Sequence, residues 1–476
     1  MVTRRELQLA ALEGGQVGLS PQQLQDLDGR LQGDLLGPGD PGWDEAVETW
    51  NAMVAKTPAL VARPLSPADV AAAVSFARDH GVLLSVKGGG HNIAGTSMAE
   101  DGLTLDMSGM REVSVDPGAR LAHAGPGCLL KDVDRATQEH GLAAPLGFVS
   151  ETGMAGLTLG GGWGYLTRRF GWTVDTLEEV EIVTADGEIR VANREEHPDL
   201  FWAVRGGGGN FGVVTRFTFR LHEVGPTITG GMRVWSADRA DEVLATYAEL
   251  TASAPPELTA AAIVRLAPPA PFLPEEWHGK PVANIVVCYS GGNAESDLAP
   301  VRDLGDPVAD LITEKPYVEQ QSMVDALEPK GLSRYWKTEY LAGIDDEYLD
   351  VFREGALDVT SPLSQSVIFH LGGALNEREP DDGAVGNREA RFISGFAGTW
   401  RPDTPADPHI DWVRRSWERI RPYSTGGNYV NFQVADDDSG RTAEAYVGNY
   451  ERLQRVKAEY DPENLFRVNR NIPPAA

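Results

Sequence analysis

The chain of 476 residues carries 42 basic and 70 acidic side chains, a formal net charge of −28, and 42% of its residues are hydrophobic. This length exceeds what one compact core usually spans, so we expect two domains. The anionic balance argues against nucleic-acid and anionic-membrane partners, because like charges repel.

Two cysteines, Cys128 and Cys288, lie far apart without metal-ligand spacing, which argues against a disulfide framework or a cysteine zinc site. The Arg4-Arg5 pair does not start an export signal, since residues 6–15 contain two glutamates and no long apolar run. No segment has the unbroken apolar length of a membrane span. We therefore expect a cytoplasmic protein.

The first elements lead into a glycine turn. Residues 1–55 are polar and glycine-rich and are interpreted as a lead-in segment. A helix is predicted from the Ser66-Pro67 cap, with Asp69 at the capping-box position, to Gly81. Residues 82–86 form a predicted strand that ends in Lys87-Gly88-Gly89-Gly90-His91-Asn92. Helix, buried strand and glycine loop in this order direct backbone amides at a ligand such as a phosphate.

Further glycine clusters follow in the same part of the chain. Short strands at residues 103–106 and 113–115 and a helix at residues 130–140 precede a glycine-dense stretch, residues 147–171. Asp186-Gly187 predicts a hairpin between strands at residues 176–184 and 188–191. A short helix at residues 199–202 enters the third cluster, residues 205–212, and residues 213–221 alternate as a half-buried strand.

The pattern of the sequence changes near Pro226, where the glycine clusters become sparse. Strands at residues 285–289 and 367–371 and helices at residues 238–252 and 407–421 indicate a second domain, residues 226–427, with a mixed or antiparallel sheet covered by helices. The last helix is predicted at residues 443–459. The overall fold class is α+β.

Several catalytic motifs are excluded. Gly207-x-Gly209-x-x-Gly212 matches a dinucleotide fingerprint, but a strand follows it where a Rossmann site needs a helix. The chain has no Walker A loop, no His-Glu-x-x-His and no Gly-x-Ser-x-Gly, so a metal site or a serine hydrolase has little support. The clusters near residues 88, 160 and 207 are either unrelated turns or, with a histidine on one of them, the site of a long, flat, phosphate-bearing cofactor.

These motifs resemble the berberine bridge enzyme family, which belongs to the vanillyl-alcohol-oxidase-type flavoproteins. The resemblance covers residues 55–225 strongly, residues 425–472 well and the middle loosely. The motifs that carry it are Val86 to Asn92, Leu159 to Gly164, Asp199 to Gly208, Phe211 to Thr215, Tyr429-Val430-Asn431 and Tyr460 to Phe466. It implies a PCMH-type FAD-binding domain at residues 56–225, a substrate domain at residues 226–427, and a C-terminal segment, residues 428–476, that returns to the FAD domain.

The resemblance further implies a cofactor, FAD, and the residues that hold it. His91 falls on the position that bonds covalently to the methyl carbon at flavin position 8. Val149 stands where many plant members carry a second, cysteine link, so a single linkage is expected. Thr152 falls on the position that controls oxygen approach. The expected cofactor-binding residues are Lys87, Gly88, Gly89, Gly90, His91, Asn92, Gly153, Gly156, Gly160, Trp163, Gly212, Val213, Tyr429 and Asn431.

In such enzymes the flavin takes a hydride while a side chain of the second domain removes a proton from the substrate. His370 follows a strand and precedes Gly372-Gly373, so it either faces the cofactor domain or is satisfied by its own sheet. Tyr429 and Asn431 are expected to alternate on one strand face as pocket residues, and Trp163 forms either an aromatic wall or core. Candidates for the base are Tyr335, Lys337, Tyr340, His370 and Tyr429, and the expected catalytic set is Tyr429, Asn431 and His370.

Three functions remain open at this stage. An oxidase would pass electrons to O2 and release H2O2, a dehydrogenase or reductase of the same fold would use another acceptor, and a flavin carrier would have no working base. The substrate is a small molecule, and sugars and other hydroxyl compounds, cyclic amines and phenolic or polyketide compounds all remain candidates. The sequence leaves the oligomeric state open.

Overall fold

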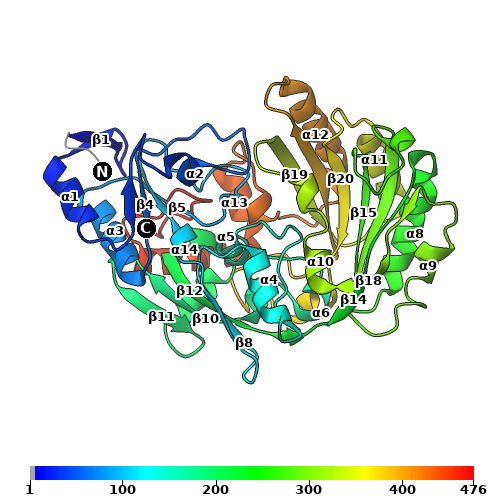
Figure 1. Cartoon of the computed structure of the whole chain (residues 1–476), viewed down its shortest axis with the longest axis horizontal. Coiled ribbons are helices and arrows are strands. Elements are labelled where there is room, and N and C mark those ends of the chain that lie inside the picture. The colour runs from blue at the N-terminus through cyan, green and yellow to red at the C-terminus, as the bar shows by residue number, and fades with distance from the viewer. Residues whose placement is uncertain (1–5) are drawn as a thin grey trace.

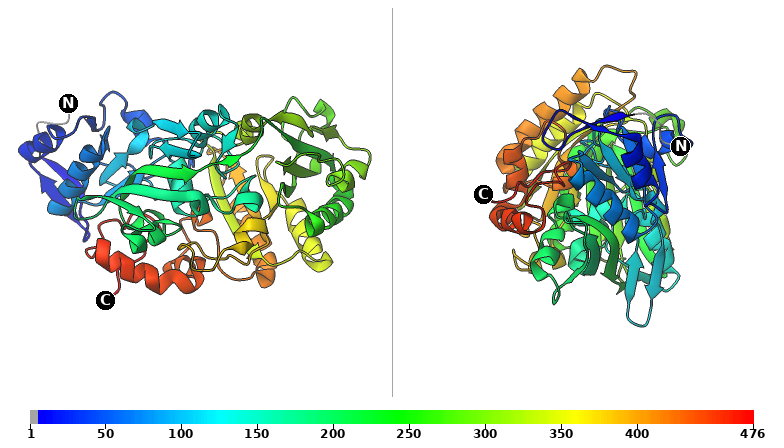
Figure 2. Two further views of the ribbon diagram at one scale, coloured as in Figure 1. Left: turned by 90° about the horizontal axis from the view of Figure 1, so that it is seen from below. Right: turned by 90° about the vertical axis from the view of Figure 1, so that its left-hand side faces the viewer.

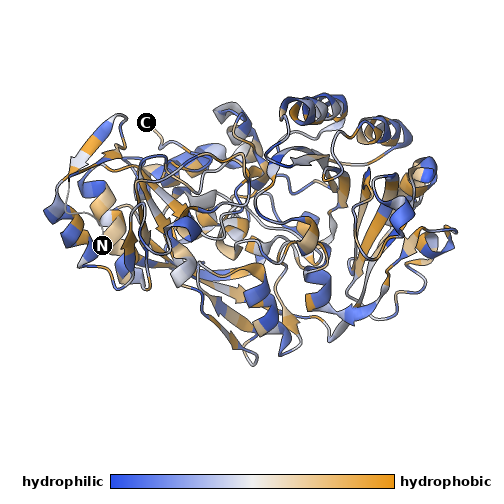
Figure 3. Ribbon diagram, turned by 45° about the horizontal axis from the view of Figure 1, so that its top comes forward, coloured by the Kyte–Doolittle hydropathy of each residue, from blue (hydrophilic) through white to orange (hydrophobic). Residues whose placement is uncertain are grey.

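The computed structural model describes residues 6–476, so the Arg4-Arg5 pair lies outside the described residues. The chain forms two lobes side by side (Figure 1). We call residues 6–225 together with 428–476 the N-terminal lobe, and residues 226–427 the sheet lobe. Strands and the inward faces of helices are mainly apolar, whereas the outer helix faces are polar (Figure 3). Among residues 6–476, no helix has both the length and the apolar character required to cross a bilayer.

The first sheet of the N-terminal lobe has the strand order β3-β4-β6-β5, with parallel β4–β6 and β5–β6 pairs. The predicted cap of α3 is confirmed, because the Ser66 side chain accepts the Asp69 N–H. The Asp69 carboxylate accepts from the N–H groups of Leu65 and Gly33, which holds the chain before β3 on this helix. Strand β3 lies inside the predicted lead-in segment, yet it pairs with β4 and forms one edge of this sheet. The elements are β1 (Leu7–Ala10), β2 (Gln16–Leu19), α1 (Pro21–Asp28), β3 (Asp34–Leu36), α2 (Trp43–Val47), β4 (Leu60–Arg63), α3 (Pro67–Asp79), β5 (Leu84–Lys87) and β6 (Leu103–Asp106).

The second sheet of this lobe is antiparallel, with the order β11-β10-β12-β8-β7. The predicted hairpin is confirmed, since β10 and β11 pair across Asp186-Gly187. Its elements, with a small β13–β9 pair, are β7 (Val113–Asp116), β8 (Leu121–Ala124), α4 (Leu130–Gln138), β9 (Leu142–Ala143), α5 (Met154–Leu159), α6 (Thr167–Phe170), β10 (Leu177–Val183), β11 (Ile189–Asn193), α7 (Pro198–Val204), β12 (Val213–Arg220) and β13 (His222–Glu223).

The sheet lobe is one eight-stranded antiparallel sheet of order β17-β14-β16-β15-β20-β21-β19, with β18 beside β14. Helices α8, α9, α11 and α12 cover one face (Figure 1). The elements are β14 (Thr227–Ser236), α8 (Ala240–Ser253), β15 (Leu258–Leu266), β16 (Pro281–Tyr289), α9 (Ala299–Asp303), β17 (Ala309–Asp310), β18 (Thr313–Pro316), α10 (Tyr317–Gln321), β19 (Ser333–Leu341), α11 (Asp346–Leu357), β20 (Gln365–His370), β21 (Phe392–Trp400) and α12 (Asp407–Ile420).

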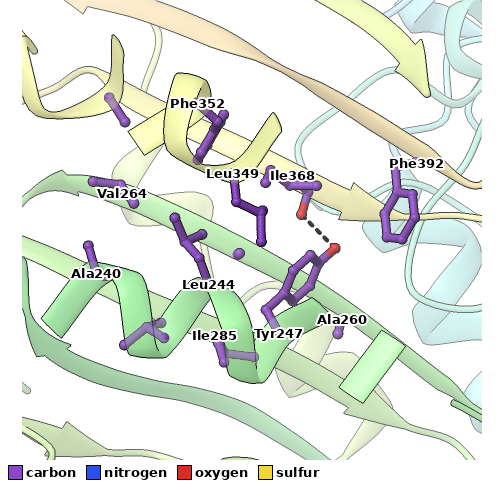
Figure 4. Packing of buried hydrophobic residues seen from close by; sticks show 14 of the residues in the cluster. Ala240, Leu244, Tyr247, Ala260, Val264, Ile285, Leu349, Phe352, Ile368 and Phe392 are labelled. Carbon is purple, nitrogen blue, oxygen red and sulfur yellow. Dashed lines mark hydrogen bonds between the residues drawn. The ribbon is translucent and has the colours of Figure 1, made fainter. Parts of the chain in front are cut away.

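The alternation of strand side chains divides this sheet into two faces. Ala260 and Val264 of β15 pack under Leu244 of α8 and Phe352 of α11, and the Tyr247 hydroxyl donates to the Ile368 carbonyl at 2.9 Å (Figure 4). The intervening side chains of β15 point to the opposite face. That face is turned toward the N-terminal lobe and holds the site described below.

The predicted single last helix is wrong: the structure has α13 (Ser439–Ala445) and α14 (Tyr450–Tyr460). The chain breaks at Val447, whose φ of +49° an α-helix cannot contain. The break lets α14 turn back along the N-terminal lobe (Figure 2). There the buried Lys457 donates to the Asn210 carbonyl at 2.7 Å and to the Asp461 carboxylate at 2.6 Å.

Candidate active site between the two lobes

A cavity of about 410 Å³ lies between the glycine loops of the N-terminal lobe and the free face of the sheet. Strand β20 contributes alternate residues to it, and β15 does so from Ala261 to Arg265, which is the pattern of a sheet wall; Thr259 and Ala260 at the start of β15 also line the cavity. Most residues predicted to hold a cofactor are brought together here. Those that line the cavity are Gly88, Gly89, Gly90, His91, Asn92, Gly153, Gly156, Trp163, Gly212, Val213, Tyr429 and Asn431. Thr152, predicted to control oxygen approach, lines it as well.

The glycine turn after β5 packs backbone to backbone against the start of α5. A Cβ on Gly89 would lie 2.5 Å from both the Cα and the N of Gly153, and a Cβ on Gly153 would meet Gly89 in turn. Neither position tolerates a side chain, and Gly90 has a φ of +69°. The result is a side-chain-free floor that leaves backbone groups close to whatever fills the cavity.

Lys87 and Gly160 are not among the cavity-lining residues. The Lys87 ammonium donates to the Ala46 carbonyl at 2.7 Å and to the Glu45 carbonyl at 3.3 Å, at the end of α2, and burial lowers its pKa. Gly160 makes room for Asn431, whose side chain occupies the space of a Cβ. Both residues thus support the loops around the cavity.

The Tyr429 and Asn431 segment is a 3₁₀ turn, Val430–Phe432, so the predicted strand alternation is wrong. The two side chains still act together. The Tyr429 hydroxyl accepts hydrogen bonds from the Gly162 N–H and the Asn431 amide, each at 3.1 Å, and burial raises the pKa of Tyr429, which keeps the phenol neutral. Asn431 also donates to the Leu157 carbonyl at 3.1 Å, so these bonds fasten the C-terminal segment to the second glycine cluster.

His91 ends the glycine turn inside an aromatic and cationic environment. Its imidazole stacks on Trp50, with ring centroids 5.0 Å apart, and the Arg334 guanidinium lies 3.6 Å from the centre of the same indole. Its Nδ1 is 3.5 Å from the Thr152 hydroxyl. Burial, followed by the charges of Arg334 and Lys330, lowers the pKa of His91 to about 3, so the imidazole is neutral near pH 7.

His370 is placed away from the cavity lining. It is 2% exposed, its Nε2 accepts from the Arg168 guanidinium at 2.8 Å, and its ring stacks on Phe392. Burial and the nearby Arg168 and Arg391 lower its pKa to about 2. Arg168 belongs to the N-terminal lobe, so the Nε2 atom is occupied across the lobe boundary and not within the sheet, and the Nδ1 atom has no hydrogen-bond partner among residues 6–476.

The other candidates for a base, Tyr335, Lys337 and Tyr340, also lie outside the cavity lining. The Tyr335 hydroxyl donates to Asp436 at 2.8 Å, and the Lys337 ammonium pairs with Asp437 at 2.5 Å. Tyr340 is 2% exposed, and burial raises its pKa.

The cavity-lining residues that sequence reasoning missed include Trp50, Arg265, Glu328 and Gln365. Trp50 lies in the presumed lead-in segment, and Glu328 lies in a loop without a motif. Arg265 did leave a signal, because it is the one charged residue in the apolar strand β15. Buried charges in strands are rare unless they are paired or functional.

A glycine-lined, histidine-bearing cavity set between a two-sheet lobe and an antiparallel sheet is the arrangement expected of one class of protein, the flavin-dependent oxidoreductases. The model of the FAD binding domain matches residues 58–193, and the model described as berberine and berberine like matches residues 428–473. The chain is 32% identical over 460 residues to (R)-6-hydroxynicotine oxidase of Paenarthrobacter nicotinovorans, covering 93% of this chain and 97% of that protein. The chain belongs to the berberine bridge enzyme family of FAD-linked oxidoreductases.

One further relative and two solved structures are similar to this chain over nearly its whole length. An FAD-linked oxidoreductase of Dictyostelium discoideum is 29% identical over 93% of this chain and 95% of its own length. The structure of 6-hydroxy-D-nicotine oxidase from Arthrobacter nicotinovorans superposes with a TM-score of 0.83 at 28% identity, over 94% of this chain and 98% of that one. Chitooligosaccharide oxidase has a TM-score of 0.83 at 22% identity, over 95% and 100% of the two chains, and shares the fold. The α+β fold and the FAD-dependent oxidoreductase class predicted from the sequence are confirmed.

The residues present fit FAD. The Gly89–Gly153 contact is a cradle that any Cβ would fill, and glycine-rich turns with free N–H groups bind phosphates. The cavity lining also includes aromatic side chains, among them Trp163 and Phe369, whose ring centroids are 4.7 Å apart. FAD supplies a ring that accepts two electrons from a substrate.

Proposed function

We propose that this protein is an oxidase that holds FAD through one covalent bond from His91, oxidises a small molecule and passes the electrons to O2. The observation that carries the proposal is the position of His91, at the end of the glycine turn and at the edge of the cavity, with its imidazole held neutral. A neutral imidazole nitrogen has a free electron pair and is a competent nucleophile, whereas a protonated one is not.

The attachment balances as an oxidation. In forming this bond His91 would lose its N–H proton and gain a C–N bond in place of one C–H bond of the methyl carbon at flavin position 8, and O2 would take the two electrons and two protons as H2O2. Trp50 holds the plane of the imidazole by stacking on it. The Thr152 hydroxyl, 3.5 Å from Nδ1, lies beside the ring from the opposite loop.

A single link is proposed because no thiol lines the cavity among residues 6–476. Val149 lines it at the position of the second link in plant members. Cys128 and Cys288 are free and buried elsewhere, and burial raises the pKa of each thiol to about 12. A thiol with so high a pKa is a poor nucleophile.

In turnover, the substrate would lie against the sheet face of the cavity and lose two electrons and two protons in total, which O2 carries away as H2O2. We assign Tyr429 and Asn431 the task of fixing the loop of Gly162 around the cofactor, since their hydrogen bonds tie the two segments together. His370 has no role in this proposal, because Arg168 occupies its Nε2. Thr152 is proposed to limit the approach of O2.

The test is the peroxide yield per substrate turned over. An oxidase releases one H2O2 for each substrate molecule. Turnover with an artificial acceptor and no peroxide would instead support a dehydrogenase, and failure of every alcohol, amine and phenol in a panel to bleach the flavin would support a flavin carrier. Thr152→Leu should slow reoxidation by O2 about tenfold or more while anaerobic flavin reduction is unchanged.

A further inference from the structure

The antiparallel sheet forms one wall of the cavity, and the centre of this wall is apolar. Ala261 and Ile263 of β15 and Val367 of β20 face the cavity, among isolated threonine and asparagine side chains. Phe369, two residues along β20 from Val367 and on the same face, stacks on Phe148 at 5.1 Å between ring centroids, and Phe148 contacts Tyr165 at 4.6 Å. Such a space accepts flat apolar groups.

Charge is confined to one end of this wall. Arg265 and Gln365 are register partners on β15 and β20, and the Arg265 guanidinium donates to the Gln365 side-chain oxygen at 3.3 Å. The Gln365 amide donates in turn to one oxygen of Glu328 at 3.3 Å. The Glu328 side chain is 11% exposed and lines the cavity.

The second carboxylate oxygen of Glu328, Oε2, has no hydrogen-bond partner among residues 6–476. The nearest cationic atom is Arg334 Nε at 3.6 Å, and it also lacks a hydrogen bond. The remaining Arg334 nitrogens are taken by carbonyls, Nη1 by Trp50 at 2.9 Å and by Leu332 at 3.1 Å, and Nη2 by Pro329. Glu328 therefore balances the charge of Arg334 without completing a hydrogen-bonded ion pair.

A buried acceptor without a donor costs free energy, unless a ligand supplies the donor. Burial raises the pKa of Glu328 against the pull of Arg334 and Arg265. An O–H or N–H group entering at this end would satisfy the free oxygen. A sugar chain would leave most of its hydroxyls unpaired against Ile263, Val367 and Phe369, and unpaired buried hydroxyls are strongly disfavoured.

We propose that the substrate is a mainly apolar, ring-containing molecule with one O–H or N–H donor that bonds to Glu328, and that Glu328 is a specificity-determining residue that selects this class over oligosaccharides. The inference rests on the proposed function only in placing the substrate in this cavity.

The test measures ligand binding to the holoenzyme without oxygen, through perturbation or bleaching of the flavin spectrum. The probes are p-cresol, toluene, which has the ring without the donor, and cellobiose. We expect p-cresol to bind about tenfold or more tightly than toluene, since a hydrogen bond to a buried charge contributes at least this much. Cellobiose should cause no change at concentrations where p-cresol saturates.

Glu328→Gln keeps the shape and removes the charge, and should weaken p-cresol binding about tenfold with toluene unchanged. Glu314→Gln, an exposed residue of β18 outside the cavity, is the matched control and should change neither. Equal binding of p-cresol and toluene to the wild type, tighter binding of cellobiose than of p-cresol, or an unchanged p-cresol affinity in Glu328→Gln would overturn the inference. The wild-type comparison holds even if the variant does not fold.

Binding needs neither turnover nor the covalent bond. If the binding experiment contradicts the substrate inference, the results on flavin attachment and peroxide release are unaffected. If those two results contradict the proposed function, the comparison of p-cresol, toluene and cellobiose can still be interpreted.

Discussion

The imidazole of His91 lies nearly parallel to the indole of Trp50, with ring planes 16° apart. Arg334, on β19 of the sheet lobe, places its guanidinium over the same indole and is fully buried. The environment of His91 is thus assembled from the glycine turn, the segment before β4 and the opposite lobe. Its consequence is an imidazole that stays neutral.

The first prediction concerns the pH dependence of flavin attachment. Because the pKa of His91 is lowered to about 3, the ring becomes protonated only as the pH falls toward that value. The attachment rate should therefore be flat between about pH 5 and about pH 8, where a histidine of ordinary pKa would titrate. The measurement is covalent FAD incorporation into protein made in riboflavin-limited cells. A tenfold loss of rate at the acidic end would contradict the account.

Removal of the Arg334 charge should raise the pKa of His91. In Arg334→Met the attachment rate is expected to fall at the acidic end of the same range, because part of the imidazole becomes protonated there, and to recover at about pH 8. Lys330→Met is a useful comparison, since Lys330 is exposed, paired with Glu48 and a smaller cause of the shift, so its effect should be weaker. An equal or larger effect of Lys330→Met would argue against the assigned role of Arg334.

Two glycines of the cavity should respond differently to alanine. Gly89→Ala puts a Cβ against Gly153 and should lower the free energy of unfolding by about 1–3 kcal/mol, with loss of flavin. Gly156, in α5, has no atom within 4 Å of an added Cβ, so Gly156→Ala should be as stable as the wild type or up to about 1 kcal/mol more stable. The Gly156→Ala variant should nevertheless bind less flavin, because residue 156 lines the cavity.

Thermal unfolding of the flavin-free proteins and the ratio of flavin to protein measure the two effects separately. Full flavin content in Gly156→Ala would show that the cofactor does not pass this position.

A buried ion pair joins the lobes. Arg388 of the sheet lobe makes two hydrogen bonds to Asp175, at 2.7 and 2.8 Å, and their side chains are 3% and 0% exposed. Arg388→Met leaves the Asp175 charge buried without its partner and should cost about 3–5 kcal/mol. The exposed pair of Arg220 and Glu178 is the control, and Arg220→Met should cost less than about 1 kcal/mol. Urea unfolding checks both, and similar losses would contradict this assignment.

Local chemistry explains which parts of the fold were predictable. The Ser66 cap and the Asp186-Gly187 hairpin depend on neighbours in sequence, and the structure has both. The strand predicted after residue 213 is also present, but its burial does not alternate: Arg216 and Arg220 are exposed, whereas Thr218 is buried. The break at Val447 was missed although Gly448 and Asn449, residues that favour turns over helix, follow it directly.

The site residues also divide into those that the local sequence predicts and those that it does not. The glycine turn and His91 are contiguous and carry their own signal. Glu328, Arg265 and Trp50 come from three distant segments that only the pairing of strands and the meeting of the two lobes bring to one cavity. His370 lies at the end of its strand as predicted, but Arg168, which occupies its Nε2 atom, lies 202 residues earlier in the chain.

The proposed bond from His91 to FAD can be tested by acid precipitation of the purified protein, followed by the absorbance of the pellet and mass analysis of the peptide that contains His91. We predict a yellow pellet with FAD on this peptide, and a colourless pellet with FAD in the supernatant for His91→Ala. A colourless wild-type pellet, or a yellow pellet in His91→Ala, would contradict the account.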